Sequence, residues 1–398
     1  MHGEIGPAAR WIAALEGRPG GKFKAESISS GNIYTGFITN SPVHWSEDSG
    51  TRESATGVVT GSSCNRHPVD RLQLHFINIC DYSGDPVRNA VDRVWWGGSE
   101  FAHGNWRLLI DTVSHLEELQ SELARSRGFA FTHAGLLQRQ DGRAFRFHEA
   151  KPFLEAIELS FAFSYGALVG PLLCRGVSEG VPVFIDVSQP HLKDYRKTRT
   201  WRPPSSTGVG HILPLMVDAT ADPVVRRELR HIILWYVETA RYSTYVEGGI
   251  ILLHSCLEAL AWLHLVHREK YLTEQAWGDL KASDKISLLL RVCSIPAETP
   301  PHFRSLHSAA RGMTGKGNHT KSTVELLTEA RNKLVHTSTE TKRIRDQFSS
   351  DLLRELSELS LWLVEAAVLH AIGFKGDCRC RIRESLADQL MRVPWSAA

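Results

Sequence analysis

Cysteine is scarce in this chain, and the spacing of its cysteines excludes a small domain held together by disulfides or by a zinc ion. The 398 residues include seven cysteines, an odd number, and no C-x-x-C pair. A disulfide-rich secreted domain or a zinc ribbon would have paired, closely spaced cysteines. The one close pair, Cys378 and Cys380, has no second pair at metal-site spacing. We therefore expect reduced, mostly buried thiols, and predict neither a metal site nor a cofactor.

The chain also lacks an excess of charge of either sign. Lys and Arg number 46 against 44 Asp and Glu, a net charge of +2, which excludes a histone-like polycation but is compatible with a local basic groove. Hydrophobic residues make up 42% and charged residues 23%, values typical of globular proteins and not of disordered chains. The length favours two domains.

Long uninterrupted apolar runs are missing as well. Met1–Gly21 has charged residues where a signal peptide would have its apolar core. Ile250–Val266 and Leu159–Cys174 are apolar, but they are shorter than a membrane span and are broken by ionisable residues or by Ser, Gly and Pro. We predict that both are buried core helices of a soluble, cytoplasmic protein without a membrane partner.

The first half of the chain has the pattern of an α+β domain. Leu72, Leu74 and Phe76 alternate with polar residues, which predicts a half-buried strand. Asp141-Gly142 predicts a hairpin turn. The further predicted strands are Ile33–Thr39, Phe129–Arg139, Arg143–His148 and Val181–Asp186, and the predicted helices are Ser114–Ser126 and Pro152–Tyr165.

The stretch Arg199–Gly210 contains Pro, Ser and Gly and is the best linker candidate. It divides a strand-rich α+β domain at 1–205 from a helical domain at 211–398. Helix-start signals in the second domain are Asp222-Pro223, Thr244-x-x-Glu247 and Ser322-x-x-Glu325. The predicted helices run from 222 to 242, 244 to 267, 284 to 293, 301 to 311, 324 to 336 and 340 to 372.

The helix that Ser322 opens carries the residues of greatest chemical interest. Val324, Leu327, Leu334 and Val335 mark its apolar face, and Arg331 falls on the same stripe. Asn332 and His336 are four residues apart and share a neighbouring face. A partly buried guanidinium needs a partner, because arginine stays charged at any ordinary pH.

The preceding apolar helix offers that partner. Its interior ionisable residues are His254 and Glu258, one turn apart, and a carboxylate is costly there unless it is paired. We predict an ion pair between Glu258 and Arg331.

The spacing Arg-x-x-x-x-His is weak evidence by itself, since it also occurs from Arg143 to His148 and from Arg226 to His231. The third occurrence, Arg331 to His336, alone has asparagine after the arginine and lies late in a capped helix. Arg331-Asn332-x-x-x-His336 resembles the signature of the HEPN superfamily, helical domains that include many metal-independent RNases. The segment Leu257–Trp262 resembles an early helix of ApeA-like anti-phage proteins, which join a strand-rich N-terminal domain to a C-terminal HEPN domain.

The resemblance implies an all-α HEPN-like bundle and an endoribonuclease used in anti-phage defence or as a toxin. It implies His336 as the proton-transfer group, Arg331 as the phosphate-stabilising residue and Asn332 as the orienting residue, supported by Glu258 and His254. It also implies a homodimer with a composite site, with RNA as the substrate. The alternatives are a non-catalytic RNA-binding or protein-interaction module and a toxin controlled by a separate regulatory partner.

A second RNA contact is predicted at residues 193–202, which overlap the start of the linker. There, basic residues alternate with aromatic ones, as in platforms that stack single-stranded bases. A solvated linker or edge strand would have the same composition. The residues are Lys193, Arg196, Lys197, Arg199, Trp201 and Arg202.

Overall fold

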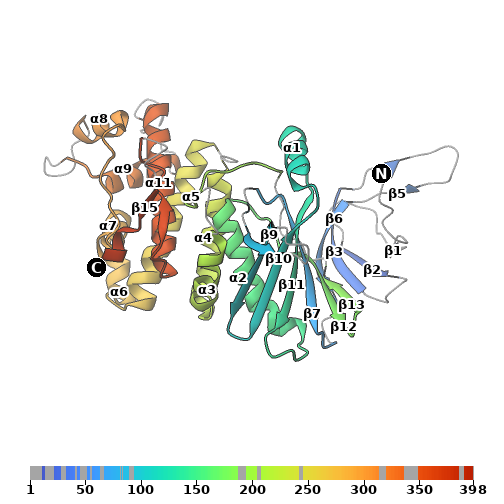
Figure 1. The fold of residues 1–398 in the computed structure, drawn as a ribbon. Helices are drawn as coiled ribbons and strands as arrows, with labels where there is room; N and C mark the ends of the chain where they lie inside the picture. Colours follow the sequence, from blue (N-terminus) through green and yellow to red (C-terminus); the bar gives the residue numbers. More distant parts are fainter. Residues whose placement is uncertain are drawn as a thin grey trace. The chain divides into compact units, whose positions relative to one another are not determined.

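The computed structural model is a mixed α+β protein that divides into two compact units (Figure 1). Unit 1 is 1–155 with 169–195, and unit 2 is 156–168 with 196–398. The structure describes residues 11–13, 22–27, 33–40, 43–44, 52–53, 56–62, 67–80, 82, 84–88, 94–186, 194–203, 208–241, 245–312, 320–335, 348–384 and 390–397.

Unit 1 is built on antiparallel sheets. The largest has seven strands in the order β13-β12-β7-β11-β10-β9-β8, and a second has the order β1-β2-β3-β6. The strands are β1 (Trp11–Ala13), β2 (Lys22–Ser27), β3 (Ile33–Asn40), β4 (Val43–His44), β5 (Arg52–Glu53), β6 (Thr56–Ser62), β7 (Arg71–Ile77), β8 (Asp85–Arg88), β9 (Val94–His103), β10 (Trp106–Thr112), β11 (Phe131–Arg139), β12 (Leu172–Ser178) and β13 (Val181–Asp186).

The alternating pattern of Leu72, Leu74 and Phe76 correctly predicted the central strand β7, where all three side chains are buried. The helix α1 (Leu116–Ser126) is also confirmed. The prediction of a strand at Arg143–His148 is wrong. Phe145 forms only an isolated β-bridge to Val69, and helix α2 (Phe147–Tyr165) begins at the end of this segment.

The predicted core helix at Leu159–Cys174 is wrong in its second half. Helix α2 ends at Tyr165, and β12 begins at Leu172. Gly166 has a φ of +61°, a conformation that glycine adopts without a steric cost and that ends the helix.

Unit 2 is mostly helical. Its elements are α3 (Gly208–Ala219), α4 (Pro223–Ala240), α5 (Val246–Trp262), the π-helix η1 (Leu263–Arg268), α6 (Glu274–Asp279), α7 (Ala282–Val292), α8 (Arg304–Gly312), α9 (Thr323–Val335), α11 (Ser350–Ala371), the hairpin β14 (Asp377–Arg379) and β15 (Leu390–Arg392), and the 3₁₀-helix η2 (Pro394–Ala397). The hairpin corrects the all-α prediction for this unit.

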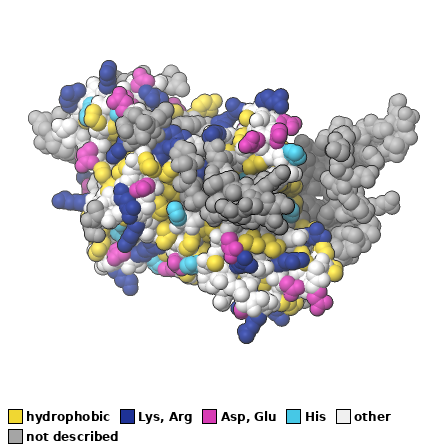
Figure 2. Space-filling model, in the orientation of Figure 1, with side chains coloured by type: hydrophobic (Ala, Val, Ile, Leu, Met, Phe, Trp, Pro, Cys, Tyr) yellow, Lys and Arg dark blue, Asp and Glu magenta, His cyan; other side chains and the backbone are white. Residues whose placement is uncertain are grey.

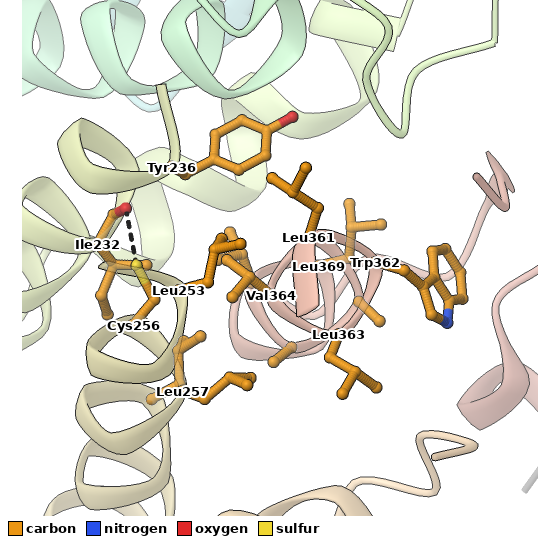
Figure 3. Packing of buried hydrophobic residues seen from close by; sticks show 14 of the residues in the cluster. Ile232, Tyr236, Leu253, Cys256, Leu257, Leu361, Trp362, Leu363, Val364 and Leu369 are labelled. Atoms are coloured by element: carbon orange, nitrogen blue, oxygen red, sulfur yellow. Dashed lines mark hydrogen bonds between the residues drawn. The ribbon is translucent and has the colours of Figure 1, made fainter. Parts of the chain in front are cut away.

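Helix α5 lies at the centre of this unit, where it packs against α4, α7, α9 and α11. Leu253 and Leu257 of α5 face Val364 of α11, and the Cys256 thiol approaches the Ile232 carbonyl of α4 at 3.6 Å (Figure 3). By length and composition alone, Val246–Arg268 is long and apolar enough to cross a membrane. Its contacts with the surrounding helices are those of the core helix that the sequence predicts.

The first described residues of the predicted linker, 199–203, instead belong to the core of unit 2. Trp201 is fully buried, stacks on Phe163 with ring centroids 5.3 Å apart, and donates from Nε1 to the Phe163 carbonyl. Polar and proline-rich composition suggested a linker, but one buried indole fixes this segment to the helices.

The same segment is held by a buried ion pair. Arg381 binds the Glu365 carboxylate of α11 through Nη2 and Nε, at 2.7 and 3.0 Å, and both side chains are at most 1% exposed. The Tyr236 hydroxyl donates to Glu365 at 2.7 Å, and the Trp201 backbone N–H donates to it at 3.1 Å. Four parts of the chain therefore meet at one carboxylate.

We expect Glu365→Gln to lower the free energy of unfolding by about 3–5 kcal/mol, because it leaves the guanidinium of Arg381 buried without its counter-charge. The double variant Glu365→Leu/Arg381→Met should be more stable than either single variant. Urea unfolding followed by circular dichroism measures this. Arg354→Ala, which removes an exposed ion pair with Asp351, is the control and should change stability by less than about 1 kcal/mol. Equal effects of Glu365→Gln and Arg354→Ala would contradict the prediction.

A second prediction concerns His133 on β11, which is fully buried in unit 1. Neither ring nitrogen has a hydrogen-bond partner among the described residues, and burial lowers the pKa of His133 to about 3. The unfolded chain therefore binds a proton below pH 6.5 that the folded chain does not, and stability falls as the pH decreases. Between pH 6.5 and 5 the loss should be about 2 kcal/mol. His133→Leu should remove this part of the pH dependence of the urea midpoint, whereas the exposed His148→Leu should not.

Candidate functional site

Helix α9 begins where the sequence predicts. The Ser322 hydroxyl accepts a hydrogen bond from the Glu325 backbone N–H at 3.2 Å, and the Glu325 carboxylate accepts one from the Ser322 backbone N–H at 2.8 Å. This reciprocal capping box satisfies two donors that the first turn would otherwise leave unpaired. It fixes the register of the helix and hence the face on which Arg331 lies.

The apolar face of α9 is confirmed in part. Val324 and Leu327 are buried, and Leu334 packs partly buried against the core. Val335, however, is 43% exposed and does not belong to this face. The helix therefore leaves the core in its last turn, near Arg331 and Asn332.

Arg331 is half-buried, and its hydrogen bonding is incomplete. Its Nη1 donates to Oδ1 of the exposed Asn332 at 3.0 Å. Its Nε is buried and has no hydrogen-bond partner in the described part of the chain. A guanidinium has five N–H donors, so this side chain retains donors for an acceptor that the described residues do not supply.

The predicted supporting pair on α5 is present. His254 is 1% exposed, and its Nδ1 lies 3.3 Å from Oε2 of Glu258. On its other side, Nε2 of His254 lies 3.3 Å from the Thr328 hydroxyl of α9. The imidazole thus links the two helices one turn before Arg331.

The predicted ion pair between Glu258 and Arg331 is wrong, since the carboxylate pairs with His254 instead. The pKa of Glu258 is lowered, and the hydrogen bond from His254 is the main cause. Burial opposes this shift, and the positive charges of Lys285 and Arg331 add smaller contributions. The Glu258 side chain is also 30% exposed. Water therefore solvates part of its charge, and the carboxylate does not need a direct arginine partner.

His336 directly follows Val335 and lies outside the described residues. The structure accordingly brings Arg331, Asn332, His254 and Glu258 to adjacent turns of α5 and α9. The prediction that the imidazole of His336 joins them stays a prediction.

The predicted RNA platform is not available to stack bases. Trp201 is fully buried, and the Arg202 guanidinium, 4.7 Å from the centroid of the Tyr165 ring, belongs to an 8% exposed residue. The Arg199 Nη2 donates to the Arg381 carbonyl. These side chains serve the core of unit 2, because the aromatic residues that suggested stacking are packing residues.

The remaining residues of that set differ in their surroundings. Arg196 donates to the Arg241 carbonyl at 2.9 Å, Lys197 is exposed, and Lys193 lies outside the described residues. The basic residues of this segment therefore do not form the continuous platform that the sequence suggested.

Sequence reasoning missed one group of potential metal ligands. His264, Cys293 and His370 come together in unit 2 with their ligand atoms within 4.8 Å of one another. They lie 29 and 77 residues apart along the chain, so no motif spacing indicates them. The Cys378–Cys380 pair, by contrast, is explained by the strand β14 and its end, where both thiols are buried.

Comparison with protein families finds similarity in both parts of the chain. Residues 65–198 match the YopA central domain, and residues 222–391 match the YopA C-terminal domain. The C-terminal match includes α5, α9 and the Arg331 region. The HEPN resemblance is not among these matches and stays a prediction.

A curated relative extends the similarity over most of the chain. The SPbeta prophage-derived uncharacterized protein YopA of Bacillus subtilis (strain 168) is 24% identical over 332 residues. The aligned region covers 82% of this chain and 72% of the relative. No solved structure matches this chain.

We expect His254→Ala to lower the free energy of unfolding by about 1–3 kcal/mol, because it removes the imidazole that joins Glu258 of α5 to the Thr328 hydroxyl of α9. Chemical unfolding followed by circular dichroism measures the change. The matched control is His231→Ala, at an exposed position of α4, which should stay within about 0.5 kcal/mol of the parent protein. If the two variants are equally stable, His254 does not link the helices energetically.

Proposed function

We propose that this protein is an endoribonuclease whose reaction needs no metal ion. The observation that carries the proposal is the half-buried Arg331, whose Nε has no acceptor in the described part of the chain and whose Nη1 is held by Asn332. Such a guanidinium is suited to a phosphate, which accepts two parallel N–H bonds. The resemblance of Arg331-Asn332-x-x-x-His336 to the HEPN signature supports the same assignment.

The proposed reaction is a transesterification within RNA. The 2′-oxygen attacks the adjacent phosphorus, the bond from phosphorus to the 5′-oxygen breaks, and the products end in a 2′,3′-cyclic phosphate and a 5′-hydroxyl. One proton leaves the 2′-hydroxyl and another reaches the departing 5′-oxygen. His336 would transfer one of these protons, since an imidazole titrates near neutral pH.

Arg331 would stabilise the negative charge that develops on the phosphoryl oxygens, and Asn332 would orient either the imidazole or the phosphate. His254 and Glu258 would act as positioning residues, because they hold α5 against α9 through Thr328. A second copy of the chain would supply the other proton-transfer group across a shared cleft, as the HEPN resemblance implies.

The biological setting that we propose is anti-phage defence or toxicity toward the host cell, with unit 1 as the sensing or targeting part. The Bacillus subtilis relative is prophage-derived, and an RNA-cleaving protein carried by a prophage would fit either role. Basic and acidic side chains are interspersed over the described part of the face in Figure 2. We expect local contacts at Arg331 to position the RNA.

The test is to incubate the purified full-length protein with RNA in EDTA and to analyse the product ends. We expect 2′,3′-cyclic phosphate ends from the parent protein. His336→Ala and Arg331→Ala should each lower the cleavage rate by at least about 100-fold. Arg331→Lys should also be strongly impaired, because lysine keeps the charge but loses the planar donor fork.

The matched control uses a second Arg-x-x-x-x-His sequence in unit 2. His231 follows Arg226 by five residues, as His336 follows Arg331, and His231→Ala should cleave like the parent protein. RNA that is retained but never cut would reject the enzyme and favour a non-catalytic RNA-binding module. Cleavage unaffected by both His336→Ala and Arg331→Ala would reject the proposed site.

A further inference from the structure

Three side chains that can bind a metal ion meet in unit 2. His264 lies in the π-helix η1, Cys293 caps the C-terminus of α7, and His370 lies in the last turn of α11. One ring nitrogen from each imidazole and the Cys293 Sγ lie within 4.8 Å of one another. Four-coordinate zinc with nitrogen and sulfur ligands needs ligand atoms roughly 3.3–3.7 Å apart, so a bound ion would draw the three donors slightly closer together.

The space between them is small and suits a single atom. A cavity of about 10 Å³ is lined by the three side chains and by Arg268, with Leu260, Leu263, Leu289, Ala367 and Ala371 completing its wall. That volume is at the lower limit for one water molecule. An ion bound at this point would have apolar side chains around it and no room for a larger organic ligand.

Cys293 is buried, whereas His264 and His370 are half-buried. The structure has no side-chain hydrogen bond from His264, Cys293 or His370 within its described ranges, although Cys293 is only 2% exposed. The two imidazoles contact each other edge to face, with centroids 5.2 Å apart. A metal ion bound between them would give the three donors a common partner.

The local backbone supports a built site. In η1 the Glu269 backbone N–H bonds to the His264 carbonyl, five residues back, in place of the usual four. Such π-helical turns often occur at functional sites. The π-helical turn holds one more residue than a regular turn, and this sets the direction in which the His264 side chain points. The turns of α5 before it are buried in the core.

We propose that His264, Cys293 and His370 form a zinc-binding site, with water or another small ligand in the fourth position. Two imidazoles and one thiolate are a donor set that zinc prefers. This site is independent of the proposed RNA chemistry at Arg331, and its three ligands tie η1, α7 and α11 together.

Zinc binds cysteine as the thiolate, so binding at this site would release the Cys293 proton to solvent. Arg268, which donates to the Ala371 carbonyl beside the cavity, places a positive charge next to the site.

The test uses the full-length protein, stripped of metal and titrated with Co²⁺ and then with Zn²⁺. We expect one equivalent of Co²⁺ to give a thiolate-to-cobalt charge-transfer band together with visible bands of tetrahedral cobalt, and Zn²⁺ to displace it. Zn²⁺ should also raise the melting temperature of the parent protein. A parent protein that gives no thiolate band and no shift in melting temperature overturns the proposal.

Variants identify the ligands. Cys293→Ser should lose the charge-transfer band, and His370→Gln should weaken Co²⁺ binding by at least about 10-fold. Cys256→Ser removes another fully buried thiol of the same unit and should leave the band unchanged. A band that persists in Cys293→Ser overturns the assignment, and circular dichroism of each variant verifies that it is folded. RNA cleavage is not part of this readout, so failure here leaves the proposed function to its own test.

Discussion

The buried ion pair between Glu365 and Arg381 is the interaction on which unit 2 most depends. The Glu365 carboxylate lies on α11, and it receives hydrogen bonds from the Arg381 guanidinium, the Tyr236 hydroxyl and the Trp201 backbone. These partners come from the end of the chain, from α4 and from the segment before α3. A buried charge of this kind contributes little net stability against an apolar replacement, but its geometry permits few alternatives. It therefore specifies which segments may pack around α11.

That constraint also organises the Arg331 region indirectly. Helix α11 packs against α5, and α5 packs against α9. The orientation of α9 is then set by its capping box and by His254, which reaches from Glu258 on its own helix to Thr328 on α9. The side chains proposed for RNA chemistry thus depend on contacts that begin at a core carboxylate far from them in the sequence.

Two local signals in the sequence predicted their elements well, because they depend on residues close together in the chain. The alternation around Leu74 gave β7, and Ser322 with Glu325 gave the start of α9. Signals that depend on tertiary packing failed. Trp201 lies in a stretch with linker composition, yet its indole is buried. Glu258 was assigned to Arg331 because no local rule shows that His254, on the same helix, is the nearer partner.

The π-helix at Leu263–Arg268 has a consequence for how this helix can vary among related chains. Each residue of an α-helix turns the chain by roughly 100°. A deletion inside the regular part of α5 would rotate the residues after it by that angle relative to the buried turns. A π-helical turn holds one more residue than an α-helical turn, so η1 can lose that residue and return to regular winding while the residues on either side keep their faces. The π-helix is thus the point at which this helix can change length with the least effect on the packing of α5.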